Sequence, residues 1–141
     1  MVSNATIRRD TFRLIRTLLD TNKPTGWTVR AVLPNVTTAF PLIFIHPVNA
    51  PAERWSLTNA NHDYDIVVPI EIMVHIDSSP SVLDTGRDNV CATLTDETNL
   101  NTLYNDDDLV FEGLDDIGQS TRDVNDQEYI TASFLLRMKK K

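Results

Sequence analysis

Cysteine is almost absent from this chain of 141 residues, where Cys91 is the single copy. One cysteine excludes a disulfide within the chain and a zinc site built from several thiolates. Glycine is also scarce, and none of the four glycines belongs to a G-x-S-x-G nucleophile turn or to a phosphate-binding loop. Cys91 itself falls on the apolar side of an expected helix, where a thiol is usually an inert packing residue. The composition therefore carries no signature of nucleophilic catalysis.

Long hydrophobic runs are missing as well. The longest nearly uncharged stretch, residues 31–52, contains four prolines and several polar breaks, so it is no membrane-spanning helix. The first residues include Arg8 and Arg9 and no apolar signal core, from which we expect a protein of the reducing cytoplasm without membrane contact. With 41% hydrophobic and 23% charged residues, the length predicts a single domain over residues 1–141 that frays at 139–141.

Charge is distributed unevenly along the chain, although the net charge is only −7. Residues 1–30 hold six basic and two acidic residues, whereas residues 63–128 hold two basic and seventeen acidic ones. An acidic centre of this size repels phosphates, so we do not expect the chain to wrap nucleic acid. The acidic stretch is either a solvated surface or one half of a contact whose basic half lies on another copy.

Two helices are expected from the apolar periodicity. The first covers residues 6–20, where Ile7, Leu14 and Leu18 follow one helical stripe. The second begins at Pro80, because proline is tolerated at the first position of a helix.

Five strands are expected besides these helices. Alternation of apolar and polar residues, or a short apolar run between prolines, indicates strands over residues 27–33, 42–45, 64–77, 109–114 and 129–138. Together with the helices they give the order α-β-β-β-α-β-β. This order predicts an α+β fold with a mostly antiparallel β-sheet and the helices packed on one face.

The alternating stretch 64–77 is the strongest of these signals. Fourteen residues at ~3.3 Å each would reach roughly 46 Å, which exceeds the ~37 Å diameter of a compact chain of this length. We therefore expect a bulge at Pro69 together with some projection of the strand beyond the body. The polar segments 47–63 and 115–127 are expected to be surface loops.

Three arginines on the first helix form a basic ridge. Arg9, Arg13 and Arg16 recur at i, i+4 and i+7, so they share one face away from the apolar stripe. This face is either solvated or a docking surface for an acidic partner. We name Arg9, Arg13 and Arg16 the arginine ridge and take them as candidate interface residues.

The densest carboxylate group consists of Asp106, Asp107, Asp108, Asp115 and Asp116. Their spacing lacks the separated acids, the glycine and the closing glutamate of a calcium-binding loop, so we interpret them as a solvated acidic surface. As the acidic half of a contact between copies, the same five residues are candidate interface residues.

The remaining titratable residues indicate no catalytic or metal site. His46, His62 and His75 do not stand at the helical spacing of a metal-binding pair. Asp65 and Glu71 share a strand face, but simple alternation predicts that geometry for any strand. We therefore expect no catalytic residue, no metal and no cofactor.

The succession of elements resembles that of the tail terminator proteins of long-tailed bacteriophages and related viruses, and of similar neck or tail-completion proteins. The resemblance spans nearly the whole chain and rests on its length, the helix 6–20, the alternating strand 64–77, the helix after Ser79 and Pro80, and the closing strand 129–138. It is a resemblance of architecture and not of a short motif.

The resemblance implies a structural protein that forms a hexameric ring at the head-proximal end of the viral tail tube. Its partners would be further copies of itself, the tail tube protein and the head connector or neck protein, and DNA would pass through the lumen without specific binding. It would be a virion component assembled in the host cytoplasm, and not an enzyme. The alternatives are another neck or head–tail joining protein, an unrelated cytoplasmic interaction module and, as a third class, an enzyme.

Overall fold

A computed structural model describes the backbone of residues 4–30, 40–46, 54–55, 62–63, 65–99, 109–124 and 126–140. The elements in chain order are α1 (Asn4–Asn22), β1 (Thr28–Arg30), β2 (Leu42–Ile45), β3 (Arg54–Trp55), β4 (His62–Asp63), β5 (Asp65–His75), α2 (Pro80–Thr95), β6 (Leu109–Val124) and β7 (Gln127–Lys140). The predicted α+β class and order of elements are confirmed. The short strands β3 and β4, which pair with each other, are additions inside the segment 47–63 that we expected to be a loop.

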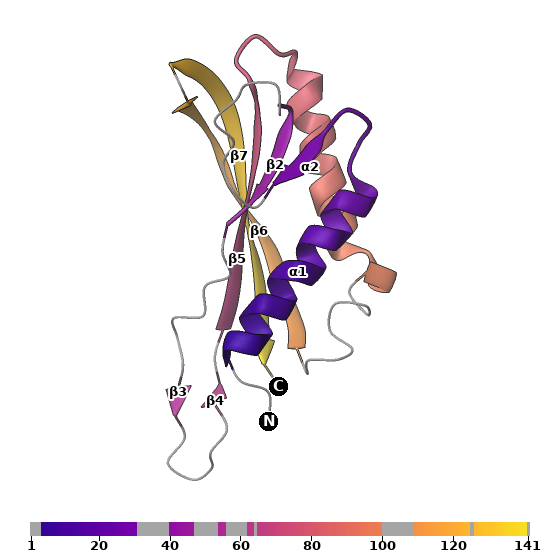
Figure 1. Cartoon of the computed structure of the whole chain (residues 1–141), viewed down its shortest axis with the longest axis vertical. Helices are drawn as coiled ribbons and strands as arrows, with labels where there is room; N and C mark the ends of the chain where they lie inside the picture. Colours follow the sequence, from indigo (N-terminus) through magenta and orange to yellow (C-terminus); the bar gives the residue numbers. More distant parts are fainter. Residues whose placement is uncertain are drawn as a thin grey trace.

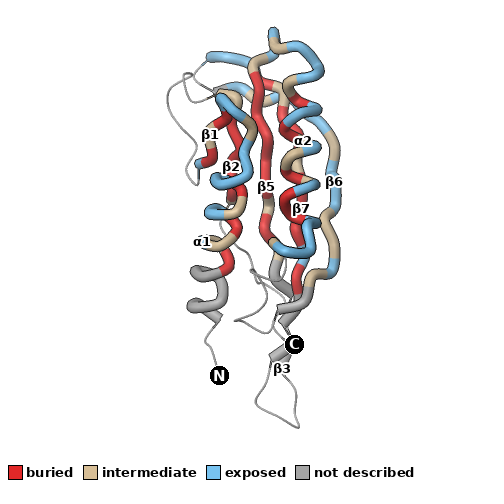
Figure 2. Tube along the Cα trace, turned by 90° about the vertical axis from the view of Figure 1, so that its right-hand side faces the viewer, coloured by how far each residue is buried: buried red, intermediate tan, exposed pale blue. Residues whose placement is uncertain are grey.

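Five strands form one sheet in the order β1-β2-β5-β7-β6. Only β1 and β2 are parallel, and every other neighbouring pair in this sheet is antiparallel. Both helices lie on the same face, α1 toward β1 and β2, and α2 toward β7 and β6 (Figures 1 and 2). The expected mostly antiparallel sheet with helices on one face is thus confirmed.

Helix α1 presents its apolar stripe to the sheet, where Ile15 and Leu19 are fully buried. At its end the Asn89 side chain of α2 donates a hydrogen bond to the carbonyl oxygen of Asn22 at 2.6 Å. This contact satisfies one of the carbonyl groups that a helix leaves unpaired at its C-terminus. It also joins the two helices where the chain turns into β1.

Strand β5 runs without a bulge, which corrects the expectation at Pro69. Its pairing with β7 is continuous from Asp65 to His75. The carbonyl oxygen of Pro69 accepts a hydrogen bond from the backbone N–H of His46, just past the end of β2. Since the N–H and C=O of one residue in a strand point to the same side, the donor that Pro69 lacks would point past β2 and not toward β7. Proline is therefore compatible with this inner strand.

The strands β6 and β7 form a long hairpin, which corrects the expected short strand 109–114 and acidic loop 115–127. A two-residue turn joins them, and Asp126 occupies the left-handed region there with φ of 63°. Two register shifts, between Phe111 and Gly113 and between Asp116 and Gly118, interrupt the pairing. β7 continues through Lys140, in the segment where we expected fraying.

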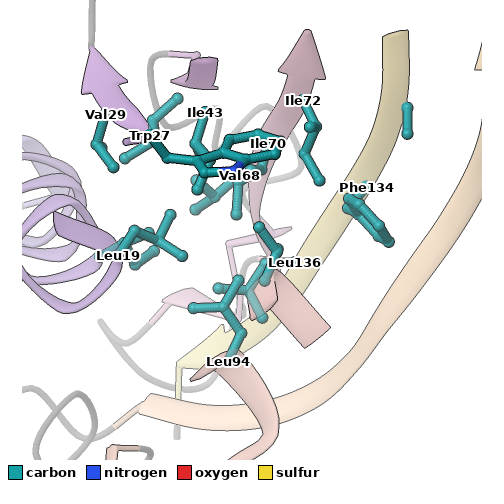
Figure 3. Packing of buried hydrophobic residues seen from close by; sticks show 14 of the residues in the cluster. Leu19, Trp27, Val29, Ile43, Val68, Ile70, Ile72, Leu94, Phe134 and Leu136 are labelled. Atoms are coloured by element: carbon teal, nitrogen blue, oxygen red, sulfur yellow. The ribbon is translucent and has the colours of Figure 1, made fainter. Parts of the chain in front are cut away.

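The main core lies between the helices and the sheet. It contains Trp27 with side chains from both helices and from the inner strands, among them Leu19, Ile43, Ile70, Leu94 and Phe134 (Figure 3). A smaller buried cluster of Leu42, Phe44, Met73 and Tyr129 lies on the opposite face of the sheet. The even-numbered residues Val68 to Val74 of β5 belong to the first cluster and Met73 to the second, as the alternation of a strand requires.

Candidate functional site

The arginine ridge lies on α1, as expected. Arg13 and Arg16 are exposed, on the side of the helix away from the buried Ile15 and Leu19. Arg9 lies in the helix too, but its side chain is outside the part that the structure describes. In that part of the chain, neither Arg13 nor Arg16 belongs to an ion pair with an acidic side chain. Arg13 and Arg16 therefore offer to a partner positive charge that no described acidic side chain pairs.

Asp115 and Asp116 lie on strand β6 and not in a loop. Asp115 accepts a hydrogen bond from Nε of Arg137 at 2.5 Å. Asp116 makes two contacts. One of its carboxylate oxygens forms an ion pair with Arg87 of α2, and the other accepts a hydrogen bond from the backbone N–H of Gly118 at 2.9 Å. The second bond fixes the register shift in β6, and the first ties this strand to α2. Ion pairs within the chain therefore neutralise part of the negative charge of Asp115 and Asp116.

Asp106, Asp107 and Asp108 lie outside the described residues. The acidic side chains that β6 exposes without an ion pair among the described residues are Glu112 and Asp123. Helix α2 adds Asp84 and Asp88, both exposed. The acidic surface of the described structure therefore extends along α2 and β6.

A buried carboxylate that we had not singled out as a site lies on the helix-free face of the sheet. Glu71 of β5 is only 8% exposed. Nη1 of Arg122 in β6 lies 2.9 and 2.7 Å from its two carboxylate oxygens, and Nε2 of His46 lies 3.1 Å from Oε2. We name these three residues the carboxylate cluster. In the sequence, Glu71 stands out as a lone acidic residue inside an otherwise apolar strand. Its two partners could not be predicted, because they lie 25 and 51 residues away.

The carboxylate cluster ties the end of β2 and the edge strand β6 to the inner strand β5. Burying a carboxylate is costly unless hydrogen-bonding and charged groups surround it, and here the guanidinium of Arg122 and the imidazole of His46 lie against it. The arrangement is suited to holding these strands together, since the carboxylate of Glu71 bridges groups from β6 and from the end of β2.

Tyr129 of β7 occupies the same face beside this cluster. Its ring stacks on Phe40 at a centroid distance of 4.2 Å and lies 5.0 Å from the ring of His75. The residue is fully buried and its hydroxyl has no hydrogen-bond partner among the described residues, and burial raises the pKa of the phenol above its ordinary value. The ring contributes packing, and its hydroxyl stays protonated at neutral pH.

Cys91 is half-buried on α2, and its thiol pKa is raised. Burial is the main cause, followed by the negative charges of Asp116 and Asp88, while Arg87 lowers the pKa. A thiol with a raised pKa is poorly nucleophilic at neutral pH. This environment agrees with the packing role that the sequence predicts.

Among the described residues, no three His, Cys, Asp or Glu side chains come close enough together to hold a metal ion. A cavity of about 160 Å³ opens beside the start of α2, between Pro80, Leu83 and Ile130. Its volume lies below the ~300–1,000 Å³ of typical small-molecule sites.

No helix in the described part of the chain is long and apolar enough to cross a membrane.

Comparison with known proteins adds little to this geometry. No family model matches the chain, and no curated protein matches it either. A chain of the solved structure "Virion of native gene transfer agent (GTA) particle" matches over 93% of this chain and 90% of that chain, with 20% sequence identity and a TM-score of 0.42. A TM-score of this size marks a loose overlap and carries no argument about function.

Proposed function

We propose that this chain is a structural protein of a tailed virus: a tail terminator that forms a ring, hexameric in the resembling family, at the head-proximal end of the tail tube and joins it to the head connector or neck. It is not an enzyme in this proposal. Its partners are further copies of itself, the tube protein and the connector, and DNA passes through the ring without specific binding. The protein would be part of the virion after assembly in the host cytoplasm.

The observation that carries this proposal is the separation of charge across the sheet. One side of the molecule consists of α1 and β1 and exposes Arg13, Arg16 and Arg30, and we name it the basic side. The other consists of α2 and β6, and we name it the acidic side. Its exposed acidic residues are Asp84, Asp88, Glu112, Asp115, Asp116 and Asp123.

Opposite charge on two different sides of one subunit favours contacts between unlike surfaces. Such heterologous contacts place copies side by side in one orientation and close into a ring when the rotation between neighbours permits it. A two-fold contact made through one side alone would instead bring two surfaces of the same sign together. The support for the ring thus comes from this charge pattern and from the resemblance in architecture, not from the loose likeness to the virion chain.

Charge reversal on each side gives a direct test. The first variant carries Arg9→Glu, Arg13→Glu and Arg16→Glu, which makes both sides acidic. The second carries Asp84→Lys, Asp88→Lys, Glu112→Lys and Asp123→Lys, which makes both sides basic, since the two remaining acids, Asp115 and Asp116, are paired with Arg137 and Arg87. We expect each variant alone to associate at least roughly tenfold more weakly than the wild type, because like charges now face each other. Light scattering at rising concentration, alone and with purified tail tubes, measures the association.

A mixture of the two variants is the matched control. The acidic surfaces of one variant complement the basic surfaces of the other, so the mixture should regain association, and an even-numbered ring can alternate the two. Circular dichroism of each variant checks that both are folded. If the arginine variant assembles and caps tubes like the wild type, the docking role of the ridge is wrong.

A second structural role is open to the same surfaces. In another neck or head–tail joining protein the charged sides would contact the connector and not further copies. Association with purified connector in the absence of self-association would favour that role over the terminator.

A further inference from the structure

The outer edge of β6 carries backbone groups that no described strand occupies. Ile76 donates its N–H to the carbonyl oxygen of Glu128, so the backbone groups of Glu128 point toward β5. Its partner in β6 is Asp123, whose N–H and C=O must then point away from β7. By the alternation of a strand, Thr121 and Gln119 point outward too, since the pairing is regular from residue 118 to 124.

This stretch of β6 has little of the usual protection of an edge strand. Natural edges are guarded by bulges, by proline and by charged side chains, lysine above all, and the charged residues here are Arg122, which pairs with Glu71 within the subunit, and Asp123. Both register shifts of β6 lie before residue 119, and residues 119–123 contain neither proline nor lysine. Gln119, Ser120, Thr121 and Asp123 are all exposed, as the pale upper part of β6 in Figure 2 shows. A strand from another molecule can therefore pair here.

The other edge of the sheet is β1, which lies on the basic side. Thr28 donates its N–H to the carbonyl oxygen of Pro41, next to β2, so the backbone groups of Val29 point to the outer edge. Among the described strands, β1 pairs with β2 alone. The exposed Arg30 follows at this edge.

The directions of these two edge strands suit each other. β1 runs parallel to β2, and three antiparallel steps lead from β2 through β5 and β7 to β6. β1 and β6 therefore run in opposite directions within one sheet. When two copies stand side by side in the same orientation, β6 of one meets β1 of the next in an antiparallel arrangement, the more stable of the two kinds of pairing.

We propose that the outer edge of β6 at Gln119, Thr121 and Asp123 pairs with β1 of a second copy, so that one sheet continues from subunit to subunit. The inference rests on the proposed ring and names the junction within it. Charge decides between the available occupants. Pairing of β6 with β6 would bring two acidic sides together, whereas pairing with β1 brings Arg30 and the arginine ridge toward the acidic side.

Proline at an outward-pointing position tests the junction. Thr121→Pro removes an N–H that points away from β7 and pairs with no described strand, so the fold should survive, while association should fall by roughly tenfold or more. Thr121→Val keeps the N–H and is the matched control, with association like that of the wild type. Thr121→Lys, a substitution that guards natural edges, should weaken association without any constraint on the backbone.

Amide hydrogen exchange of the wild type provides a second measurement that needs no substitution. The amides of Gln119, Thr121 and Asp123 should exchange quickly in dilute protein and become protected when the protein assembles. If Thr121→Pro and Thr121→Lys assemble like the wild type, or if these amides stay unprotected in the assembly, the junction is wrong. The proposed function survives that result as long as the charge-reversed variants fail alone and associate when mixed. A wild type that never associates overturns both.

Discussion

Gly86 shows how a single residue ties α2 to the rest of the molecule. A β-carbon at this position would lie 2.3 Å from Cη2 of Trp27, inside the ring's van der Waals surface. Glycine weakens a helix, and the sequence alone marks Gly86 as a weak point in α2. The structure supplies the reason for it, because the indole of Trp27 packs directly on the helix backbone.

The substitution Gly86→Ala is expected to lower the free energy of unfolding by about 1–2 kcal/mol, because the overpacking outweighs the gain in helix propensity of up to about 1 kcal/mol. Urea denaturation followed by tryptophan fluorescence measures the change. Gly113→Ala is the control, since no heavy atom lies within 4 Å of its β-carbon position. It should stay within about 0.5 kcal/mol of the wild type. Equal stability of the two variants would contradict the proposed contact.

At the scale of elements, the β6–β7 hairpin depends on contacts that cross the sheet. Among the described strands, β6 pairs with β7 alone. Its described side chains are exposed or half-buried. Two of its side chains reach past β7 or onto the helix layer: Arg122 contacts Glu71 of β5, and Asp116 contacts Arg87 of α2. These pairs hold the edge strand in the orientation that its proposed junction requires.

Glu71→Ala should lower the free energy of unfolding by about 1–3 kcal/mol, since it removes the buried acceptor that Arg122 and His46, both partly exposed, share. Asp115→Ala is the control, because it removes the acidic side chain of an exposed ion pair with Arg137. It should lower the free energy of unfolding by no more than about 1 kcal/mol. Thermal unfolding of the two variants at the same pH compares them. A larger loss for Asp115→Ala would show that the carboxylate cluster is not what fastens the hairpin.

At the scale of the whole molecule, each charged side contains one edge of the sheet. The basic side includes the edge strand β1, and the acidic side includes the edge strand β6. Side-by-side copies can therefore form backbone pairs and complementary charge contacts in one interface. This coincidence is what links the proposed ring to the proposed junction.

An interface of this kind should respond to salt. Raising the ionic strength from about 0.15 M to about 1 M shortens the Debye length from about 8 Å to about 3 Å, so self-association should weaken by roughly tenfold. Sedimentation at several salt concentrations measures the effect. Association that strengthens with salt would indicate an apolar interface and contradict the charge argument.

Much of the fold could be predicted from local periodicity, and the failures share one physical cause. Helices α1 and α2 and strands β5 and β7 show the period of 3.6 or 2 that burial of a face produces, and β2, which is buried at every residue, shows a continuous apolar run. β6 buries little and is shifted twice in register, so its alternation breaks at Glu112 and Ile117. The expected acidic loop was wrong for this reason.

The candidate interface residues divide in the same way. The exposure of Arg13 and Arg16 follows from helix geometry and could be predicted, whereas the ion pairs of Asp115 and Asp116 depend on partners 22 and 29 residues away. The carboxylate cluster likewise joins residues 25 and 51 positions apart. No local sequence pattern indicates contacts between residues so far apart in the chain.

The sequence by itself determined the α+β class, the order of elements, the core face of each periodic segment and the uneven distribution of charge, because these depend on local repeat and composition. Only the tertiary structure decided the order of strands in the sheet, the length of β6 and the ion pairs of Asp115 and Asp116. It also decided that the sheet ends in two edges of opposite charge and opposite direction. Those properties arise from pairing between distant segments, whose register is set by the packing of the whole chain.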